Sequence, residues 1–201
     1  MPVHTDSPIR FFLATSNPGK RDEYRDIAEG NPVQLDLLPN FNGYPPFDES
    51  APTFAENAAG KALHYSRLTD EIILADDSGL VVPALGGEPG VHSARYAGLG
   101  ASDAERYRKL LRELHGKKGD ERSAHFVCVI AIAHRGSARA IVSAQTEGVL
   151  LEEPRGAGGF GYDPIFYFPT LGKTFAELSR QEKNQHSHRG LAFQRLLASL
   201  L

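Results

Sequence analysis

The stretch that most constrains the fold is an apolar run, residues 72–75, that leads directly into two adjacent carboxylates, Asp76 and Asp77. A short apolar run of this kind is typical of a buried strand. Ser78 and Gly79 follow and predict a turn at the end of that strand. If the strand continues through the pair, the two carboxylates point to opposite faces and cannot share one task. The pair therefore either begins a turn or forms part of a site that holds a divalent cation and activates water.

Length and charge limit the class of protein. A chain of 201 residues is long enough for one sizeable domain, here residues 1–201, and its net charge of −3 argues against a basic nucleic-acid-binding surface. No apolar run approaches the roughly 20 residues of a membrane span, and the first residues lack the apolar core of a signal peptide. The single cysteine, Cys128, excludes an internal disulfide and predicts a small core residue. We therefore expect a cytoplasmic protein without membrane or nucleic-acid partners.

Near the N-terminus, residues 9–14 predict a strand, and the polar segment after it predicts the start of a helix. Asn17 suits an N-cap and Pro18 suits the first helical position. Lys20 then lies in the first turn, where a lysine opposes the helix dipole. A cation and free backbone N–H groups at one place make an anion site, although a capped surface helix with a solvated lysine explains the same residues. The candidate anion-binding residues are Thr15, Ser16, Asn17, Pro18, Gly19 and Lys20.

The next segment combines a short strand, a loop and a helix. Residues 33–38 predict the strand, and the loop after it carries Glu49, which is either solvated or reaches a metal. Thr53 and Glu56 form the capping-box pattern at the start of the helix. Glu56 suits this structural role, and Lys61 on the same helix is either a phosphate ligand or a surface charge.

The middle of the chain predicts a loop, a helix and a β-hairpin. Residues 83–100 are rich in Gly and Pro and predict an ordered loop. Ser102 begins a second capping box, and the amphipathic helix that follows is expected to pack on the core or on a partner. Residues 124–133 and 138–144 predict the two strands of a central hairpin that turns at residues 135–137.

A dense glycine cluster surrounds Phe160 within residues 156–164. Glycine lets the backbone approach a ligand closely, but its ordering in a folded domain is entropically costly. Phe160 or Tyr162 is expected to stack on a planar base, and Asp163 to accept hydrogen bonds or support a metal. The competing interpretation is a glycine-rich turn that carries two core aromatic residues.

The last polar segment precedes a terminal helix. Ser187 suits its N-cap, which places His188 and Arg189 in the first turn, and Lys183 lies just upstream. Cationic side chains at the positive end of a helix are unfavourable unless an anion joins them. The segment therefore either binds a phosphate or a purine carbonyl, or forms a basic solvated surface.

Together these segments resemble the inosine triphosphate pyrophosphatase family, and they occur in the family's order along nearly the whole chain. Each motif is weak to moderate alone, and the ordered set is highly specific. The matching segments are residues 15–20, 53–58, 75–80, 90–96 and 158–166, with Lys183 and residues 187–190.

The resemblance implies an α/β fold: a long mixed β-sheet flanked by helices, in two lobes around a central nucleotide cleft. It also implies a homodimer and a requirement for Mg²⁺. The implied reaction is hydrolysis of XTP, ITP and dITP to the monophosphate and pyrophosphate, which removes deaminated purines from the nucleotide pool.

The resemblance also implies roles for individual residues. Asp77 is the implied catalytic base and a magnesium ligand, with Glu49 as the second metal carboxylate. Asp48 and Glu56 stay open as alternatives to Glu49, because Ser-Ala follows it where the family commonly has Thr-Gly. Phe160 is implied to stack on the base. The implied substrate-binding residues are Thr15, Ser16, Asn17, Pro18, Gly19, Lys20, Ser78, Phe160, Gly161, Tyr162, Asp163, Lys183, His188 and Arg189.

Selection of the base is a hydrogen-bonding problem at purine position 6. A donor aimed at this position pairs with a carbonyl and is left facing another donor if adenine enters. His188 and Arg189 are the candidate donors. Two other functions stay open: a pyrophosphatase for modified pyrimidines, disfavoured by the final Ser-His-Arg-Gly block, and a nucleotide-binding regulator without turnover, disfavoured by the intact Asp76–Asp77 pair.

Overall fold

The computed structural model describes residues 8–200, and these divide into two compact units. Unit 1 comprises the residues up to Asp76 together with Ile130–Val142, and unit 2 comprises Asp77–Val129 together with the residues from Ser143 onward. The strands are β1 (Ile9–Leu13), β2 (Val33–Leu37), β3 (Ile73–Val81), β4 (Ser123–His134), β5 (Ser137–Leu150), β6 (Phe166–Phe168) and β7 (Lys173–Thr174). The α-helices are α1 (Pro18–Ala28), α2 (Phe54–Ser66), α3 (Asp103–Glu113), α4 (Arg180–His186) and α5 (His188–Leu200).

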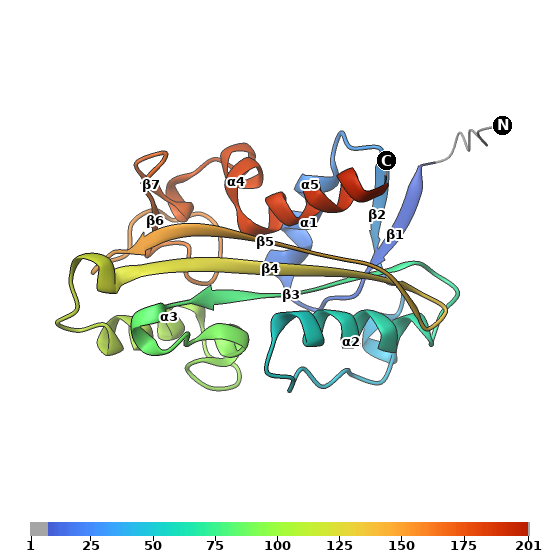
Figure 1. Cartoon of the computed structure of the whole chain (residues 1–201), viewed down its shortest axis with the longest axis horizontal. Helices are drawn as coiled ribbons and strands as arrows, with labels where there is room; N and C mark the ends of the chain where they lie inside the picture. The colour runs from blue at the N-terminus through green and yellow to red at the C-terminus, as the bar shows by residue number, and fades with distance from the viewer. Residues whose placement is uncertain (1–7, 201) are drawn as a thin grey trace. The chain divides into compact units, whose positions relative to one another are not determined.

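The strands of residues 8–200 form one seven-stranded sheet in the order β2-β1-β3-β4-β5-β6-β7. β1 pairs in parallel with both β2 and β3, whereas β6 pairs antiparallel with β5 and with β7. The sheet is therefore mixed and flanked by helices, which confirms the predicted fold class (Figure 1).

Local sequence signals explain the helix starts of unit 1. The Asn17 side chain accepts a hydrogen bond from the backbone N–H of Lys20, and Pro18 occupies the first helical position of α1, as predicted. Thr53 caps α2 in the same way by accepting from the N–H of Glu56. α1 buries Tyr24 against the interior of the unit, and α1 and α2 lie on opposite sides of the strands (Figure 1).

Strand β3 differs from the prediction, because it does not end at the carboxylates. It continues through Asp76, Asp77, Ser78 and Gly79 to Val81, and no turn forms at Gly79. The turn prediction was wrong because it treated the polar residues as solvated. In the structure Asp76 and Asp77 are 0% and 5% exposed, and Lys20 and Lys61, both distant in sequence, contact the carboxylate and the carbonyl of Asp76.

The predicted hairpin of β4 and β5 is confirmed, with its turn at Arg135 and Gly136. Both turn residues have positive φ angles, 50° and 73°, which suits the tight turns that join twisted antiparallel strands. β4 is the middle strand of the sheet, and β5 extends to Leu150, beyond the predicted end at residue 144. Cys128 is buried within β4, as predicted.

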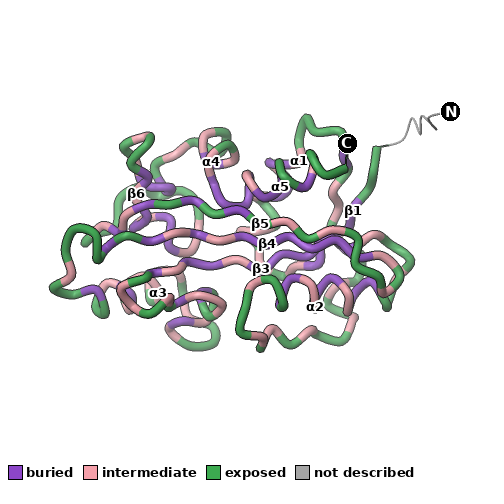
Figure 2. The backbone as a smooth tube through the Cα atoms, viewed as in Figure 1, coloured by how far each residue is buried: buried purple, intermediate pink, exposed green. Residues whose placement is uncertain are grey.

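The core of unit 2 combines aromatic and aliphatic side chains. The ring centroid of Phe126 on β4 lies 4.6 Å from that of Phe166 and 5.9 Å from that of Phe175. Leu110 on α3 and Leu80 on β3 belong to the same buried cluster, so the predicted packing role of α3 is confirmed. Burial of each such side chain contributes roughly 1.5–3 kcal/mol. Figure 2 shows the central strands as largely buried, so polar side chains on them need specific partners.

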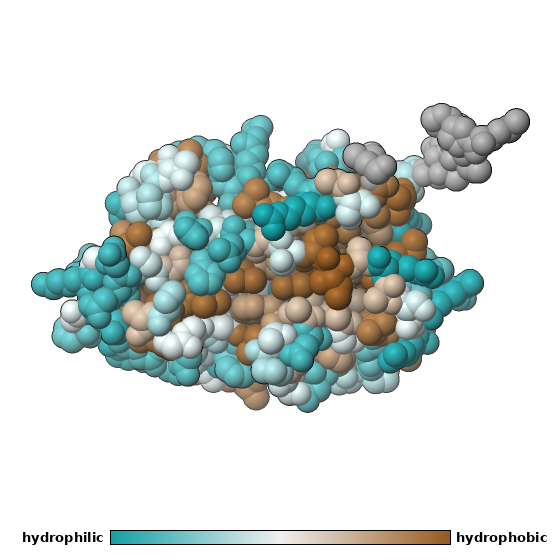
Figure 3. All heavy atoms as spheres, viewed as in Figure 1, coloured by the Kyte–Doolittle hydropathy of each residue, from teal (hydrophilic) through white to brown (hydrophobic). Residues whose placement is uncertain are grey.

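Within residues 8–200 no helix is both long and apolar enough to cross a bilayer. On the face drawn in Figure 3, hydrophobic residues lie among hydrophilic ones. Large exposed apolar side chains include Leu99, at 93%, and Ile141, at 52%, and single exposed residues of this kind are common on globular proteins.

Candidate functional site

In unit 1, two lysines converge on Asp76 in strand β3. The Lys20 ammonium lies 3.0 Å from the Asp76 carboxylate, and the Lys61 ammonium donates to the Asp76 carbonyl at 2.9 Å. Lys61 also lies 2.5 Å from a carboxylate oxygen of Glu49. Lys61 is buried, which removes the surface-charge alternative for it. These contacts place three charged groups from separate segments around the Asp76 position of strand β3.

The loop after β1 leads into the N-terminus of α1. Its Thr15 hydroxyl accepts from the backbone N–H of Asn17, and the first turn of α1 contains no acidic residue. A cavity of about 590 Å³ lies beside this loop in unit 1, lined by Thr15, Ser16, Arg21 and residues of the 37–43 segment. A helix N-terminus beside a cavity, with no carboxylate of its own, suits a phosphate group.

In unit 2, Asp77 binds the backbone of Ser78, and the side chain of Ser78 meets a buried arginine. A carboxylate oxygen of Asp77 accepts from the backbone N–H of Ser78 at 2.9 Å. Arg189, at the start of α5, donates to the Ser78 hydroxyl at 2.8 Å and is only 1% exposed. The predicted cap of α5 is confirmed, because the Ser187 hydroxyl accepts from the N–H of Gly190. That cap positions the arginine in the first turn of the helix.

The glycine-rich segment forms a tight turn that presents Phe160. Asp163 is buried, accepts from the backbone N–H of Phe160 at 2.8 Å, and pairs with the buried ammonium of Lys183. Gly159 has φ +68°, and a Cβ at this position would collide with the Asp163 carboxylate, so the turn requires glycine there. Tyr162 is 3% exposed. Of the two aromatic residues, Phe160 is therefore the one available for stacking.

Two cationic groups lie over or near the Phe160 ring. The Lys183 ammonium is 5.1 Å from the ring centroid, and the Arg189 guanidinium carbon is 5.8 Å from it. His188 is buried and stacks on Phe126, with ring centroids 4.7 Å apart and an interplanar angle of 11°. The side chains around Phe160 thus include two that can only donate hydrogen bonds.

The carboxylates present suit a hard cation whose remaining ligands come from the substrate. Among residues 8–200 no group of three or more His, Cys, Asp or Glu side chains is arranged to hold a metal by itself. Magnesium is commonly held by one or two carboxylates plus substrate phosphates, so Asp77 and Glu49 fit it as individual ligands. Glu56 is less suitable, because its carboxylate accepts from the Thr53 hydroxyl at 2.7 Å and completes the helix cap.

The sequence profile of the Ham1 family matches residues 11–199. The chain belongs to the Ham1 family. It is 50% identical over 184 residues to the dITP/XTP pyrophosphatase of Geobacillus kaustophilus, covering 92% of this chain and 90% of that protein. The dITP/XTP pyrophosphatase of Thermus thermophilus is 48% identical over 189 residues, covering 94% and 90%. The solved structure of a HAM1 protein from Coxiella burnetii matches with a TM-score of 0.85 and 42% identity, over 96% of this chain and 98% of that one.

The Ham1 match confirms the family resemblance found in the sequence. Within unit 1 the structure brings together Lys20, Asp76, Lys61 and Glu49, and within unit 2 it brings together two further sets: Ser78 with Arg189, and Phe160 with Asp163, Lys183 and Arg189. The roles assigned to these residues stay predictions.

Three contacts of this Ham1 protein were not predicted from the sequence. The Ser93 hydroxyl accepts from the backbone N–H of Leu80 on β3, and the Ser93 carbonyl accepts from the Tyr162 hydroxyl at 2.9 Å. Asp103, at the start of α3, accepts from the backbone N–H of Gly161. A serine within a Gly/Pro-rich loop does not by itself predict such a contact. The sequence predicted Asp103 only as part of the capped start of a helix.

Helix α4, which carries Lys183, was also missed. It begins with a capping box in which the Ser179 side chain accepts from the N–H of Glu182 and the Glu182 carboxylate accepts from the N–H of Ser179. The Glu182 carboxylate also accepts from Lys173 at 3.0 Å. These hydrogen bonds, with that from the Ser179 backbone first, lower the pKa of Glu182 from 4.5 to about 2.

The lowered pKa of Glu182 predicts an acid-sensitive helix start. Because the pKa is lower in the folded than in the unfolded chain, the stabilisation is fully present above about pH 4.5 and is lost as the pH falls toward 2. We expect Glu182→Gln to lower the melting temperature at pH 7, and the difference from wild type to shrink at pH 3. Thermal unfolding followed by circular dichroism at both pH values checks this. A difference of equal size at the two pH values would contradict it.

Proposed function

We propose that this Ham1 protein hydrolyses the non-canonical purine nucleoside triphosphates XTP, ITP and dITP to their monophosphates and pyrophosphate, and so clears deaminated purines from the nucleotide pool. The names of its relatives from Geobacillus kaustophilus and Thermus thermophilus support this reaction. The observation that carries it is the placement of Lys183 and Arg189 near the ring of Phe160.

This placement supports selection of a 6-oxo purine. A base that stacks on Phe160 meets the side chains of Lys183 and Arg189, which have hydrogen-bond donors and no acceptor. A carbonyl at position 6 accepts from such donors, whereas the amino group of adenine adds another donor. We assign the donor role to Arg189 and Lys183, with His188 as a further candidate from the same helix start.

The phosphates are assigned to the cationic group of unit 1. Lys20, Lys61 and the N-terminus of α1 supply positive charge, and the loop residues Thr15 and Ser16 line the adjacent cavity. We assign to Asp77 the role of base: its carboxylate takes a proton from water as the water oxygen bonds to the α-phosphorus. The bond from that phosphorus to the bridging oxygen breaks, and pyrophosphate leaves with the electron pair.

Magnesium is the proposed cofactor, with Asp77 and Glu49 as its carboxylate ligands. When bound, it neutralises phosphate charge that the lysines leave uncompensated. Glu49 is preferred over Asp48 because its carboxylate contacts Lys61, which in turn contacts the carbonyl of Asp76.

The functional unit proposed is the whole chain, residues 1–201. The family match runs through both compact units, from residue 11 to residue 199, which supports one domain rather than two separate ones. A homodimer and a cytoplasmic location are further proposals, carried by the family resemblance and by the role in the nucleotide pool. Sedimentation velocity of the purified protein tests the dimer.

One assay tests the proposed reaction. The protein is incubated with Mg²⁺ and each of ITP, XTP, dITP, ATP, GTP and dTTP, and released pyrophosphate is measured. We expect turnover of the first three, at least about 100-fold above that of ATP, because a donor-lined site disfavours an amino group. Chelation of Mg²⁺ is expected to stop the reaction. Binding of ITP without pyrophosphate release would indicate a regulator instead, and release from pyrimidine triphosphates alone would indicate a different pyrophosphatase.

A further inference from the structure

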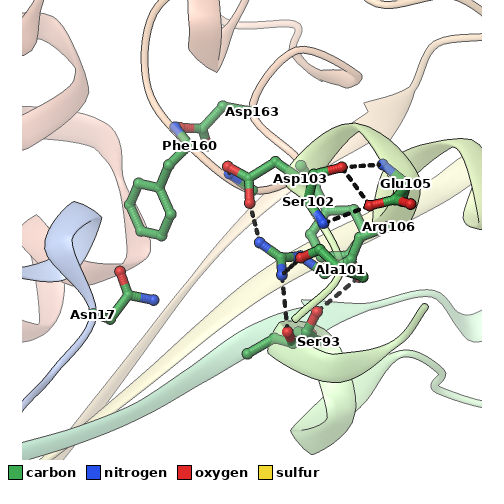
Figure 4. Close-up of polar contacts among 12 residues, drawn as sticks. Asn17, Ser93, Ala101, Ser102, Asp103, Glu105, Arg106, Phe160 and Asp163 are labelled. Carbon is green, nitrogen blue, oxygen red and sulfur yellow. Dashed lines mark hydrogen bonds and ion pairs between the residues drawn. The ribbon is translucent and has the colours of Figure 1, made fainter. Parts of the chain in front are cut away.

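The turn that presents Phe160 is held by a second carboxylate besides Asp163. Asp103, the first residue of α3, accepts from the backbone N–H of Gly161 at 2.6 Å. Its other carboxylate oxygen pairs with the guanidinium of Arg106, one helical turn further along α3 (Figure 4). Two consecutive N–H groups of the turn, those of Phe160 and Gly161, therefore each bind an acidic side chain.

Arg106 is itself fixed by the backbone before α3. It donates to the carbonyl of Ala94 at 3.0 Å. It also donates to the carbonyl of Ala101 at 2.6 Å (Figure 4). The carbonyl of Ser93, next to Ala94, accepts from the Tyr162 hydroxyl. The backbone carbonyls of the adjacent residues Ser93 and Ala94 thus bind the turn, through Tyr162, and Arg106.

This arrangement gives Asp103 a role beyond starting a helix. The cap of α3 is complete without it, because Ser102 and Glu105 form the capping box. The Asp103 carboxylate instead links the helix to the backbone of Gly161, a residue with φ +65°. A hydrogen bond between a carboxylate and a backbone N–H is stronger than a neutral one, so it restrains the turn effectively.

We propose that Asp103, oriented by Arg106, is a positioning residue that fixes the Phe160 ring for the purine base. The inference rests on the proposed function, because it takes Phe160 as the surface on which the base stacks. Asp103 acts through the backbone of Gly161 and makes no contact with the substrate itself.

Steady-state kinetics with ITP test this role. We expect Asp103→Ala to raise KM about tenfold, as for loss of a charged hydrogen bond, and to change kcat by less than about twofold. Asp103→Asn retains an acceptor oxygen for the Gly161 N–H and should recover most of the loss. Glu105→Ala is the matched control, since it removes a carboxylate from the same helical turn that contacts Ser102 and not the Phe160 turn.

A double-mutant comparison and hydrogen exchange complete the test. In a Phe160→Ala background, Asp103→Ala should change KM by less than about twofold, because the ring on which it acts is absent. Backbone hydrogen exchange of a peptide covering residues 158–163 should quicken about tenfold in Asp103→Ala and stay unchanged in Glu105→Ala.

The possible results separate the two proposals. A normal KM in Asp103→Ala, together with a raised KM in Phe160→Ala, overturns the role of Asp103. A normal KM in Phe160→Ala overturns base stacking instead, and hydrogen exchange then decides alone whether Asp103 fixes the turn. Equal exchange in wild type and Asp103→Ala overturns it.

Discussion

Replacing Asp77 by Asn is expected to lower kcat for ITP by about 10²–10⁴-fold while leaving nucleotide binding measurable. The amide oxygen of Asn can still accept from the backbone N–H of Ser78, so the local backbone of β3 should be preserved. What the variant loses is the negative charge that takes up a proton. Pyrophosphate release gives kcat, and isothermal titration calorimetry with ITP gives the binding constant.

Asp76→Asn is the matched control for this experiment, because it removes the same charge one residue away in the same strand. The Asp76 carboxylate pairs with Lys20, so this variant should act mainly on binding of the phosphates and on stability. Near-normal turnover in Asp77→Asn would remove Asp77 from its proposed role. An equal loss of kcat in both variants would show that negative charge in this part of β3, rather than the Asp77 position, is what turnover requires.

Replacing Lys183 by Met is expected to destabilise the fold by about 3–5 kcal/mol, because it leaves the carboxylate of Asp163 buried without its cation. The two side chains are only 8% and 4% exposed, so water cannot substitute for the lost partner. Selectivity for ITP over ATP should fall as well, since a donor near the Phe160 ring is removed. Urea unfolding and the ratio of kcat/KM for the two substrates measure these effects.

The double variant Lys183→Met with Asp163→Asn separates charge imbalance from lost packing. It buries two neutral side chains, so at least half of the lost stability should return. Selectivity should not return with it, because the donor stays absent. An unchanged unfolding midpoint in Lys183→Met would show that the buried pair does not hold the Phe160 turn in place.

Helix starts were predictable from the sequence because capping is a local interaction. Asn17, Thr53, Ser102 and Ser187 each precede a helix and accept from a backbone N–H inside it. The cap of α4 has the same Ser-x-x-Glu pattern but was overlooked, because a helix of seven residues shows no apolar stripe.

The course of β3 was less predictable, because the partners of its polar residues lie far away in the chain. Ser78 accepts from Arg189, 111 residues further on, and the carbonyl of Asp76 accepts from Lys61 on another helix. Local sequence patterns favour a turn for Asp-Ser-Gly. A buried strand forms there because partners from distant segments offset the cost of burying the polar groups. The family resemblance, rather than periodicity, pointed to Ser78 and Arg189 as substrate-binding residues.

One carboxylate, that of Asp163, makes several contacts at once, and this limits how the substrate range of this enzyme can be changed by protein engineering. Its carboxylate holds the Phe160 backbone and the Lys183 ammonium, and it lies where any side chain at Gly159 would have to go. A library that varies Gly159, Asp163 or Lys183 will therefore lose folded protein together with selectivity.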